Sequence, residues 1–240
     1  MTDISTRLLV IVPTYNERDN LPPLIEGLLR TPELRVLVVD DGSPDGTGEV
    51  ADTLARHTQS RVSVLHRTGP RGFGLSHIDG LIWGLATDAT VFCQMDADLS
   101  HNPADVPRLV AATKDAELVI GSRYVRGGRI ENWPRRRLVL SAFANQYIRT
   151  ITRLRPRDCT SGFRCWTRNA LERLPLRGLT SNGYAFQVEL LWEAAAAGCR
   201  VVEVPITFVE RRQGVSKLSA RVIMESALMP WHLALRRSRR

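Results

Sequence analysis

The chain has 240 residues, of which 43% are hydrophobic, so it can bury a substantial core and we expect one domain. Lysine and arginine outnumber aspartate and glutamate by 33 to 25, and the formal net charge of +8 favours anionic partners such as nucleotides, phospholipid headgroups or nucleic acid. A membrane-spanning helix, which needs about 18 to 20 consecutive apolar residues, is excluded, since the best candidate at residues 222–235 contains Glu225, Pro230 and His232.

Strands and helices alternate through the first half of the chain. Short β-branched runs predict strands at 8–12, 36–39, 62–65, 91–95 and 118–120, separated by helical patterns at 21–29, 47–57 and 76–87 and by a helix that opens at Asn102-Pro103. After Gly121 the alternation stops in a segment rich in glycine and arginine. A long helix at 135–154, a helix at 186–197, a strand at 201–208 and an amphipathic end follow. The order predicts an α/β fold with a mostly parallel central sheet flanked by helices.

The cysteines and the first residues indicate a cytoplasmic protein. Cys93, Cys159, Cys165 and Cys199 form no CxxC pair and show no spacing typical of a zinc site, so we expect reduced structural thiols. The first apolar stretch follows acidic Asp3 and is too short for a signal peptide, and it is therefore interpreted as a first strand.

Two acidic clusters follow predicted strands. Asp96-Ala97-Asp98 leaves the apolar run 91–95, and Asp40-Asp41 follows 34–39, with Ser43 and Asp45 close behind. Loops that leave the carboxyl ends of parallel strands converge on one crevice, so both clusters can face a single ligand. Together they predict a metal-assisted nucleotide site, although Asp45 is more simply explained as a turn former.

The sequence VPTYNE at 12–17 follows the first predicted strand. Its proline, aromatic ring and polar side chains suit a grip on a base and a ribose. The alternative is an ordinary strand-to-helix turn with Asn16 or Asn20 as a helix cap.

Nine motifs occur in an order that resembles a known family. The first five resemble glycosyltransferase family 2, whose fold is GT-A: VPTYNE at 12–17, VVDDGSPDGT at 38–47, GPRGFG at 69–74, QMDADLSHNP at 94–103 and GSRY at 121–124. The other four are similar to the polyprenyl (dolichyl) phosphate mannose synthases: ENWPRRR at 131–137, DCTSGFRCW at 158–166, SNGYAFQVELL at 181–191 and RRQGVSKLS at 211–219. The resemblance covers about residues 8–219.

The resemblance implies a donor site in about residues 1–125. GDP-mannose would be the donor, and Mg²⁺ or Mn²⁺ would neutralise the leaving diphosphate. Asp98 would be the chief metal ligand and Asp96 the second. Ser100 would join the metal shell, at a position where the family often has glutamine. The residues expected to bind the nucleotide sugar are Pro13, Tyr15, Glu17, Asp40, Asp41, Asp96 and Ala97.

The resemblance also implies an acceptor site in about residues 126–220. The phosphate of a polyprenyl monophosphate is already ionised, so mannose transfer with inversion needs fixed cations rather than a base. The expected phosphate ligands are Arg123, Arg137, Arg211 and Lys217, with Arg123 and Asp98 as the catalytic residues. The neighbours Arg135, Arg136 and Arg212 are expected to be solvated or to face lipid.

Three alternatives stay open. The sugar could be another, such as glucose. The acceptor could be a glycan hydroxyl with Glu189 as base, although a structural role for Glu189 beside an arginine is favoured. The basic chain could instead bind nucleic acid on a degenerate transferase fold, but it carries no recognition-helix or RNA-binding signature, so we expect no nucleic-acid partner.

The lipid substrate implies contact with a membrane. Residues 138–154 and the basic segment 221–240 combine apolar residues with arginines, as an interfacial helix and a polybasic patch would. We therefore expect peripheral binding to an anionic surface on the cytosolic face. The alternative explanation of this pattern is an ordinary amphipathic helix packed on the core, followed by a frayed tail. A separate membrane-anchoring protein is a further candidate partner.

Overall fold

A computed structural model describes residues 6–181, 183–210 and 220–237. Its elements in chain order are β1 (Leu8–Thr14), α1 (Leu21–Leu29), β2 (Arg35–Asp40), α2 (Thr47–His57), β3 (Val62–His66), α3 (Phe73–Leu85), β4 (Val91–Gln94), the 3₁₀ turn η1 (Pro103–Asp105), α4 (Val106–Ala112), β5 (Leu118–Ser122), β6 (Arg129–Glu131), α5 (Arg135–Thr152), β7 (Arg164–Thr167), α6 (Arg168–Glu172), η2 (Leu176–Gly178), α7 (Gly183–Ala196), β8 (Val201–Pro205), β9 (Thr207–Val209) and α8 (Ala220–Arg237).

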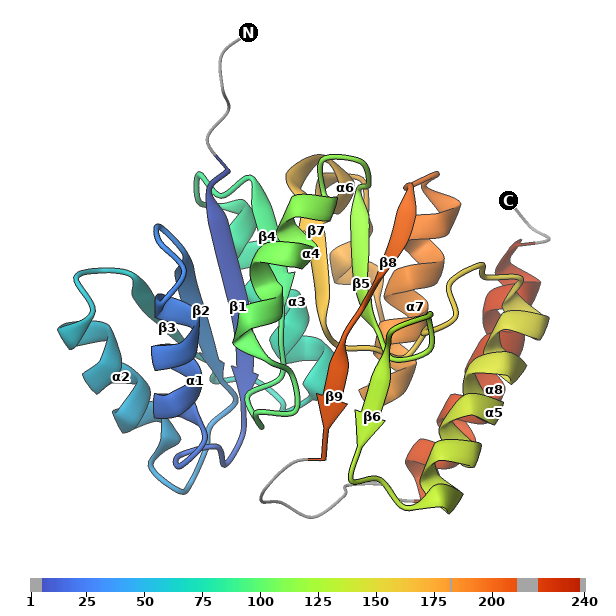
Figure 1. The fold of residues 1–240 in the computed structure, drawn as a ribbon, viewed down its shortest axis with the longest axis horizontal. Coiled ribbons are helices and arrows are strands. Elements are labelled where there is room, and N and C mark those ends of the chain that lie inside the picture. The colour runs from blue at the N-terminus through green and yellow to red at the C-terminus, as the bar shows by residue number, and fades with distance from the viewer. Residues whose placement is uncertain (1–5, 182, 211–219, 238–240) are drawn as a thin grey trace, which may run out of the picture.

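The main sheet has seven strands in the order β3-β2-β1-β4-β7-β5-β8 (Figure 1). Only β7 runs antiparallel to its neighbours β4 and β5, and the other adjacent pairs are parallel. A separate two-stranded sheet pairs β6 with β9. The prediction of a single α/β domain with a mostly parallel sheet is confirmed.

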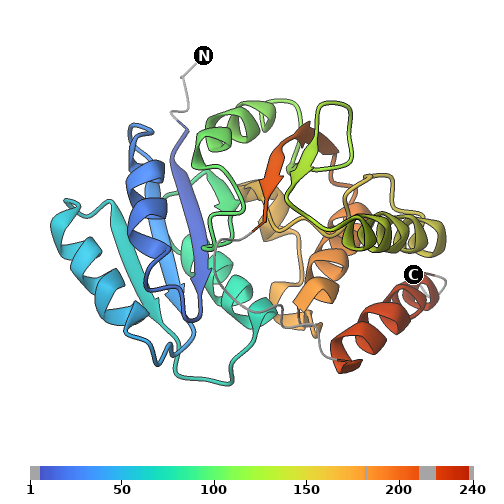
Figure 2. The same cartoon turned by 60° about the horizontal axis from the view of Figure 1, so that its bottom comes forward.

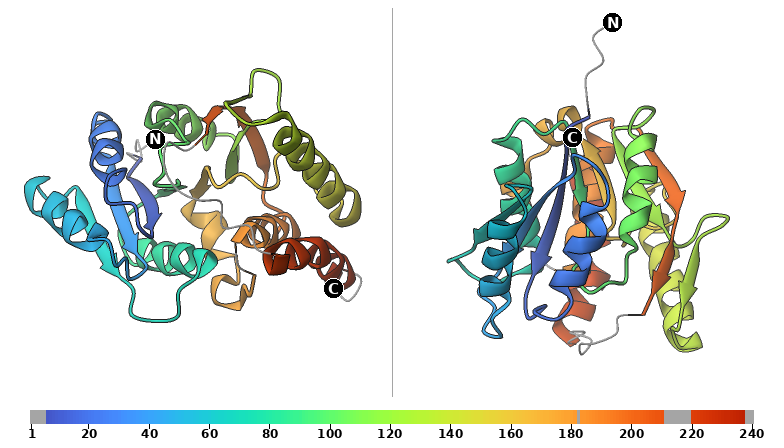
Figure 3. Two further views of the ribbon diagram at one scale, coloured as in Figure 1. Left: turned by 90° about the horizontal axis from the view of Figure 1, so that it is seen from below. Right: turned by 60° about the vertical axis from the view of Figure 1, so that its left-hand side comes forward.

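The sheet is buried on both faces, which explains the continuous apolar runs of its strands. Alternate residues of β1 enter different cores: Leu9 and Ile11 pack with α3, α6 and α7, whereas Val10 and Val12 pack with α1, α2 and α4. Figure 3 shows these two groups of helices on opposite sides of the sheet. Because β1, β2 and β4 are parallel, their carboxyl ends meet at one edge, which is the lower edge in Figure 1.

Most predicted elements lie where the patterns placed them, and α1 and α2 match at both ends. The prediction of one strand over 201–208 is wrong. β8 ends at Pro205 in the main sheet and β9 begins at Thr207 in the small sheet. Buried Ile206 links the two sheets, since its N–H donates to the Ser122 carbonyl of β5 at 3.0 Å and its carbonyl accepts from Arg129 N of β6 at 2.9 Å. Asn102 caps the next helical turn through its side chain, which accepts from Ala104 N, whereas Asn20 makes no side-chain cap bond.

The helices α5 and α8 pack side by side at one end of the sheet (Figures 1 and 2). The Tyr147 hydroxyl on α5 donates to the Ala227 carbonyl at 2.8 Å and accepts from Trp231 Nε1 at 2.9 Å. The pair leaves large apolar side chains exposed: Val139, Leu140 and Phe143 on α5, and Leu228, Trp231 and Leu235 on α8. In the part of the chain that the structure describes, no helix is long and apolar enough to cross a membrane.

Candidate active site

The loop after β1 is fixed by bonds to the loop after β2. Glu17 N donates to Thr47 Oγ1 at 3.0 Å, and the Glu17 carboxylate accepts from Asn20 Nδ2 at 2.8 Å. Arg71 lies over Tyr15, with its Cζ 5.0 Å from the ring centroid and Nη1 donating to the phenol oxygen. Pro13 pairs with Val39 inside the sheet. The loop therefore places the Tyr15 ring beside the Arg71 guanidinium group, at the edge of the sheet where the carboxyl ends of the strands lie.

The Asp40-Asp41 pair is buried and holds the surrounding loops together. Asp40 Oδ1 accepts from Thr14 Oγ1 at 3.2 Å and from Ser43 Oγ at 2.5 Å. Asp41 accepts from Gly72 N at 2.8 Å and forms an ion pair with Arg67. These bonds join the carboxyl ends of β1 and β2 to the glycine-rich segment before α3. A role for either carboxylate in nucleotide binding stays a prediction.

Asp45 is a turn former, as its setting in the sequence suggested. Its Oδ1 accepts from Thr47 N at 3.0 Å and from Thr47 Oγ1 at 2.6 Å. Burial by itself raises the pKa of Asp45, but hydrogen bonds from Thr47 and Arg18 outweigh burial and hold the pKa below its usual value.

The loop after β4 orients the two carboxylates of the DAD motif. Asp98 Oδ1 accepts from Ser100 N at 3.1 Å and from Ser100 Oγ at 2.5 Å, in a tight turn in which Leu99 adopts a left-handed φ of 61°. Asp96 faces Gly162, where a Cβ would lie only 3.2 Å from the Asp96 carboxylate. Ala97 is buried between them.

The buried His101 holds the backbone of this loop in place. The Asp96 N–H donates to His101 Nδ1 at 3.4 Å, and the imidazole stacks on Phe163 with ring centroids 5.0 Å apart. Burial lowers the pKa of His101 to about 4, although the charge of Asp98 acts in the opposite direction. His101 is therefore neutral at pH 7 and serves as an acceptor.

The donor set of this loop fits a divalent cation that is shared with a substrate. Magnesium is usually held by one or two protein carboxylates together with substrate phosphates and water. Asp96 and Asp98 supply two carboxylates, and among the described residues no group of three or more His, Cys, Asp or Glu side chains forms a closed cage. The Ser100 hydroxyl, which donates to Asp98, orients that carboxylate, and direct ligation by Ser100 stays a prediction.

Arg123, at the end of β5, is held in a buried ion pair. Its Nε and Nη2 donate to the two oxygens of Asp158 at 2.8 and 2.7 Å, its backbone N–H donates to Asp158 at 3.0 Å, and Nη2 also reaches Thr160 Oγ1 at 2.8 Å. Asp158 is fully buried. Burial by itself raises the pKa of Asp158, but the charge and hydrogen bonds of Arg123 outweigh burial and hold the pKa below its usual value.

Arg137, on the first turn of α5, lies against an aromatic ring. Its Cζ is 3.9 Å from the centroid of Trp133, and its guanidinium forms an ion pair with Glu210 at the end of β9. Arg123 also lies near Trp133, at 5.8 Å from the same centroid. The structure therefore brings these two predicted phosphate ligands together, whereas Arg211 and Lys217 lie outside the described residues.

Strand β9 joins the acidic loop to the two arginines. Val209 N donates to the Ser100 carbonyl at 3.1 Å. The Phe208 ring lies between His101 and Trp133, at centroid distances of 5.3 and 5.5 Å. Two carboxylates and two guanidinium groups are thus arranged around one short strand, a setting that suits binding of a metal-bound diphosphate beside a second anion.

Several of these contacts had no role in the sequence interpretation. Asp158 and His101 both stand inside quoted motifs, but neither was assigned a partner. The signal for Asp158 is charge balance, because an arginine that leaves a buried strand needs a carboxylate nearby. Glu189 was favoured as a structural residue that pairs with an arginine, and the structure shows this pairing: Glu189 accepts from Thr180 N and Ser181 N at 3.2 and 3.0 Å and forms an ion pair with Arg236.

Comparisons with known proteins identify the family. The model of the family described as Glycosyl transferase family 2 matches residues 9–178. A polyprenol monophosphomannose synthase of Mycolicibacterium smegmatis is 51% identical over 223 residues, covering 92% of this chain and 84% of the relative. An undecaprenyl-phosphate mannosyltransferase of Micrococcus luteus is 47% identical over 234 residues, covering 96% of each.

Solved structures show the same fold at lower identity. A crystal structure of glucosyl-3-phosphoglycerate synthase from Mycobacterium tuberculosis, in complex with Mn²⁺, uridine-diphosphate-glucose and phosphoglyceric acid, has a TM-score of 0.68 at 19% identity, with 95% of this chain and 80% of that chain covered. A complex of the same synthase with Mn²⁺, uridine-diphosphate and phosphoglyceric acid has a TM-score of 0.70 at 18% identity, covering 96% and 79%.

The buried ion pair predicts a large cost for Asp158→Asn. The substitution leaves the charge of Arg123 buried without a counter-ion, which should lower the free energy of unfolding by about 3–5 kcal/mol at pH 7, as measured by urea denaturation. The pKa of Asp158 is lower in the folded state than in the unfolded state. The contribution of Asp158 to the free energy of unfolding is therefore complete at a pH above the ordinary aspartate pKa, and it is lost as the pH falls through the pKa of the folded state.

The difference between wild type and Asp158→Asn should therefore shrink below about pH 4. The exposed Asp115→Asn is the control, with an expected change within about 0.5 kcal/mol. A loss at Asp158 as small as that of the control would contradict the structural importance of the pair.

Proposed function

Because the chain belongs to glycosyl transferase family 2, we propose that it transfers mannose from GDP-mannose to a polyprenyl monophosphate with inversion, releasing GDP. The observation that carries the proposal is the arrangement around β9, where the Asp96–Asp98 loop and the arginine pair lie on either side of Phe208. The relatives named polyprenol monophosphomannose synthase and undecaprenyl-phosphate mannosyltransferase support the sugar and the lipid phosphate.

The donor flank has the charges that a nucleotide sugar requires. Pro13, Tyr15, Glu17 and Asp40 would contact the guanosine. Asp41, which directly follows β2, would lie near the ribose or support the loop. A divalent cation, Mg²⁺ or Mn²⁺, would supply charge neutralisation for the leaving diphosphate. Asp96 and Asp98 would hold it, and Ser100 keeps Asp98 in one orientation through two hydrogen bonds.

The acceptor flank needs fixed positive charge rather than a base. A lipid phosphate is ionised near neutral pH, so it can attack the anomeric carbon directly from the face opposite the diphosphate. Arg123, locked by Asp158, and Arg137, seated on Trp133, would hold it in line despite the repulsion between two phosphates. Glu189, the one candidate base, is occupied by two backbone N–H groups and by Arg236, which supports a phosphate acceptor over a hydroxyl.

The paired helices α5 and α8 support a peripheral position at the cytosolic face of a membrane. Among the described residues, six of the seven large exposed apolar side chains lie on these two helices, and Arg135 and Arg136 are exposed at the start of α5. Apolar residues flanked by arginine suit the interface of an anionic bilayer. A separate membrane-anchoring protein would use the same face and is the alternative occupant.

Transfer and its dependence on Asp98 provide the first test. Purified protein mixed with labelled GDP-mannose, Mg²⁺ and a short polyprenyl phosphate should move label into organic solvent. Asp98→Asn should reduce this rate at least a hundredfold, a loss of about 2.7 kcal/mol, because the cation loses its chief ligand. Asp115→Asn should behave as wild type.

The alternatives are separated in the same assay. Labelled UDP-glucose in place of GDP-mannose tests the other sugar, and a glycan acceptor tests the hydroxyl. Salt-sensitive binding to arbitrary DNA without transfer would support the nucleic-acid interpretation instead. Normal turnover by Asp98→Asn would remove the metal role from that residue.

Two neighbouring arginines provide a matched pair for the acceptor. Arg137→Gln should raise the KM for polyprenyl phosphate or lower kcat, with a combined loss of at least tenfold in kcat/KM, about 1.4 kcal/mol. Arg135→Gln removes the same charge two residues away from an exposed site and should change kcat/KM less than twofold. Equal losses in the two variants would indicate a general electrostatic effect rather than a contact.

Vesicle binding tests the membrane face. Leu140→Ser with Phe143→Ser removes two exposed apolar side chains from α5, each worth about 1.5–3 kcal/mol when buried, so partitioning onto phosphatidylglycerol vesicles should fall at least tenfold. The control is Phe73→Ser, the exposed apolar residue on α3. Unchanged partitioning of the double variant would show that α5 does not enter the interface.

A further inference from the structure

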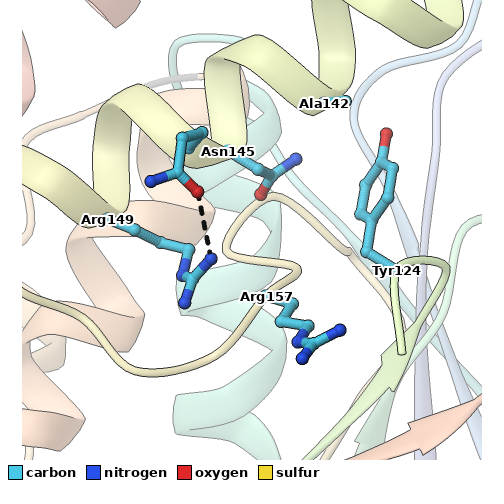
Figure 4. Close-up of a pocket in the computed structure, with 6 residues that line it drawn as sticks. Tyr124, Ala142, Asn145, Arg149 and Arg157 are labelled. Atoms are coloured by element: carbon cyan, nitrogen blue, oxygen red, sulfur yellow. Dashed lines mark hydrogen bonds between the residues drawn. The ribbon is translucent and has the colours of Figure 1, made fainter. Parts of the chain in front are cut away.

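A small pocket lies between α5 and the loop that follows it, to one side of the two phosphate-binding arginines. Figure 4 shows it, with a volume of about 240 Å³. It is lined by Tyr124, Ala142, Asn145, Gln146, Arg149 and Arg157. Two of these six residues are arginines and none carries a carboxylate, so the lining is positively charged.

Three polar side chains of the lining already have hydrogen-bond partners. Asn145 Oδ1 accepts from Cys159 N at 2.8 Å, and Gln146 Oε1 accepts from Arg149 Nη1 at 3.2 Å, which is the bond drawn in Figure 4. The Tyr124 hydroxyl donates to Ser141 Oγ at 2.7 Å. The pocket therefore offers few acceptors to its own guanidinium groups.

The nearest carboxylates are also engaged elsewhere. Asp158 pairs with Arg123, and the two oxygens of Glu203 accept from the backbone N–H groups of Arg157 and Asp158 at 2.8 and 3.0 Å. Within the described residues, Arg149 Nε is buried without an acceptor. A buried donor left in this state is unfavourable, so the pocket has an N–H donor that an anion would satisfy.

We propose that this pocket is a second anion site, which takes the phosphate group of a phosphate ester through Arg149 and Arg157. A guanidinium group suits phosphate because its N–H donors match the spacing of the phosphate oxygens. Ala142, which lines the pocket, directly precedes exposed Phe143 on α5, so a phospholipid headgroup bound here would have its chains beside an apolar part of that helix. This membrane source rests on the proposed function, whereas the anion site itself does not.

The site is separate from the transfer chemistry but adjoins it. Asn145 Nδ2 donates to Thr160 Oγ1 at 3.3 Å, and Thr160 also accepts from Arg123 at 2.8 Å. Neither Arg123 nor Arg137 lines the pocket. An anion here would fix the end of the 153–158 loop, at Arg157, against α5 without occupying the acceptor position.

The test compares two double variants of equal charge. Arg149→Gln with Arg157→Gln removes the pocket cations. Arg30→Gln with Arg56→Gln removes two exposed arginines, one directly after α1 and one on α2, at the other end of the sheet. Inorganic phosphate is titrated at constant ionic strength against chloride while Tm is followed. Binding to phosphatidylglycerol–phosphatidylcholine vesicles is measured by sedimentation.

The pocket variant should lose at least tenfold in affinity for phosphate, for the vesicles or for both, while the control pair changes less than threefold. A loss for free phosphate alone would identify a soluble anion as the ligand, and a loss for vesicles alone would identify a headgroup. Equal behaviour of the two double variants in both measurements would overturn the site.

Transfer activity separates this inference from the proposed function. With a short polyprenyl phosphate in detergent, the pocket variant should retain transfer within about twofold of wild type, because its arginines do not contact the reacting groups. Absence of transfer in the wild type would overturn the proposed function, whereas the anion site stands or falls on the two binding measurements.

Discussion

The buried ion pair between Arg123 and Asp158 is the contact on which both halves of the site depend. Arg123 directly follows β5 of the main sheet, and Asp158 lies in a loop whose backbone N–H groups donate to Glu203 on β8. A guanidinium group can stay buried at this point only because a carboxylate meets it at two atoms. The pair thereby fixes the direction of a positive charge beside the acidic loop, and it does so before any substrate binds.

The small β6–β9 sheet holds the acidic loop close to Arg123 and Arg137. The chain leaves the main sheet after Pro205, and β9 follows in the small sheet. Val209 N on β9 donates to the Ser100 carbonyl, and the Phe208 ring contacts both His101 and Trp133. Carboxylates that suit a cation and guanidinium groups that suit an anion are then held at a fixed separation by aromatic rings and backbone hydrogen bonds. Under the proposed function, opposite charges arranged in this way would suit a reaction between two phosphate-bearing substrates: the carboxylates would hold a cation against one phosphate, and the guanidinium groups would face the other.

The arginines of the chain have several different kinds of partner. Arg67 and Arg123 neutralise buried carboxylates, Arg137 lies on Trp133 beside Glu210, and Arg236 ties α8 to Glu189 and Glu193 on α7. Arg149 and Arg157 differ from these because the carboxylates near them are already committed. The net charge of +8 therefore gives little information about the partner. Among the described residues, an arginine whose neighbouring carboxylates are bound to other groups is a better indication of where an anion binds.

The sequence alone determined strands β1 to β5, most of the helices and the edge at which the site lies, whereas it predicted no strand at β6 or at the antiparallel β7. Continuous apolar runs require strands buried on both faces, and parallel strands bring Asp40 and Asp96 to one edge whatever the rest of the chain does. Only the tertiary structure decided the partners: Arg123 meets a carboxylate 35 residues away, and Arg137 meets one 73 residues away. The break at Pro205 that produces β9 was also missed, because 201–208 has a strand pattern throughout. Local patterns record the burial of a residue, whereas pairing between distant residues follows from how the layers pack, which no single segment encodes.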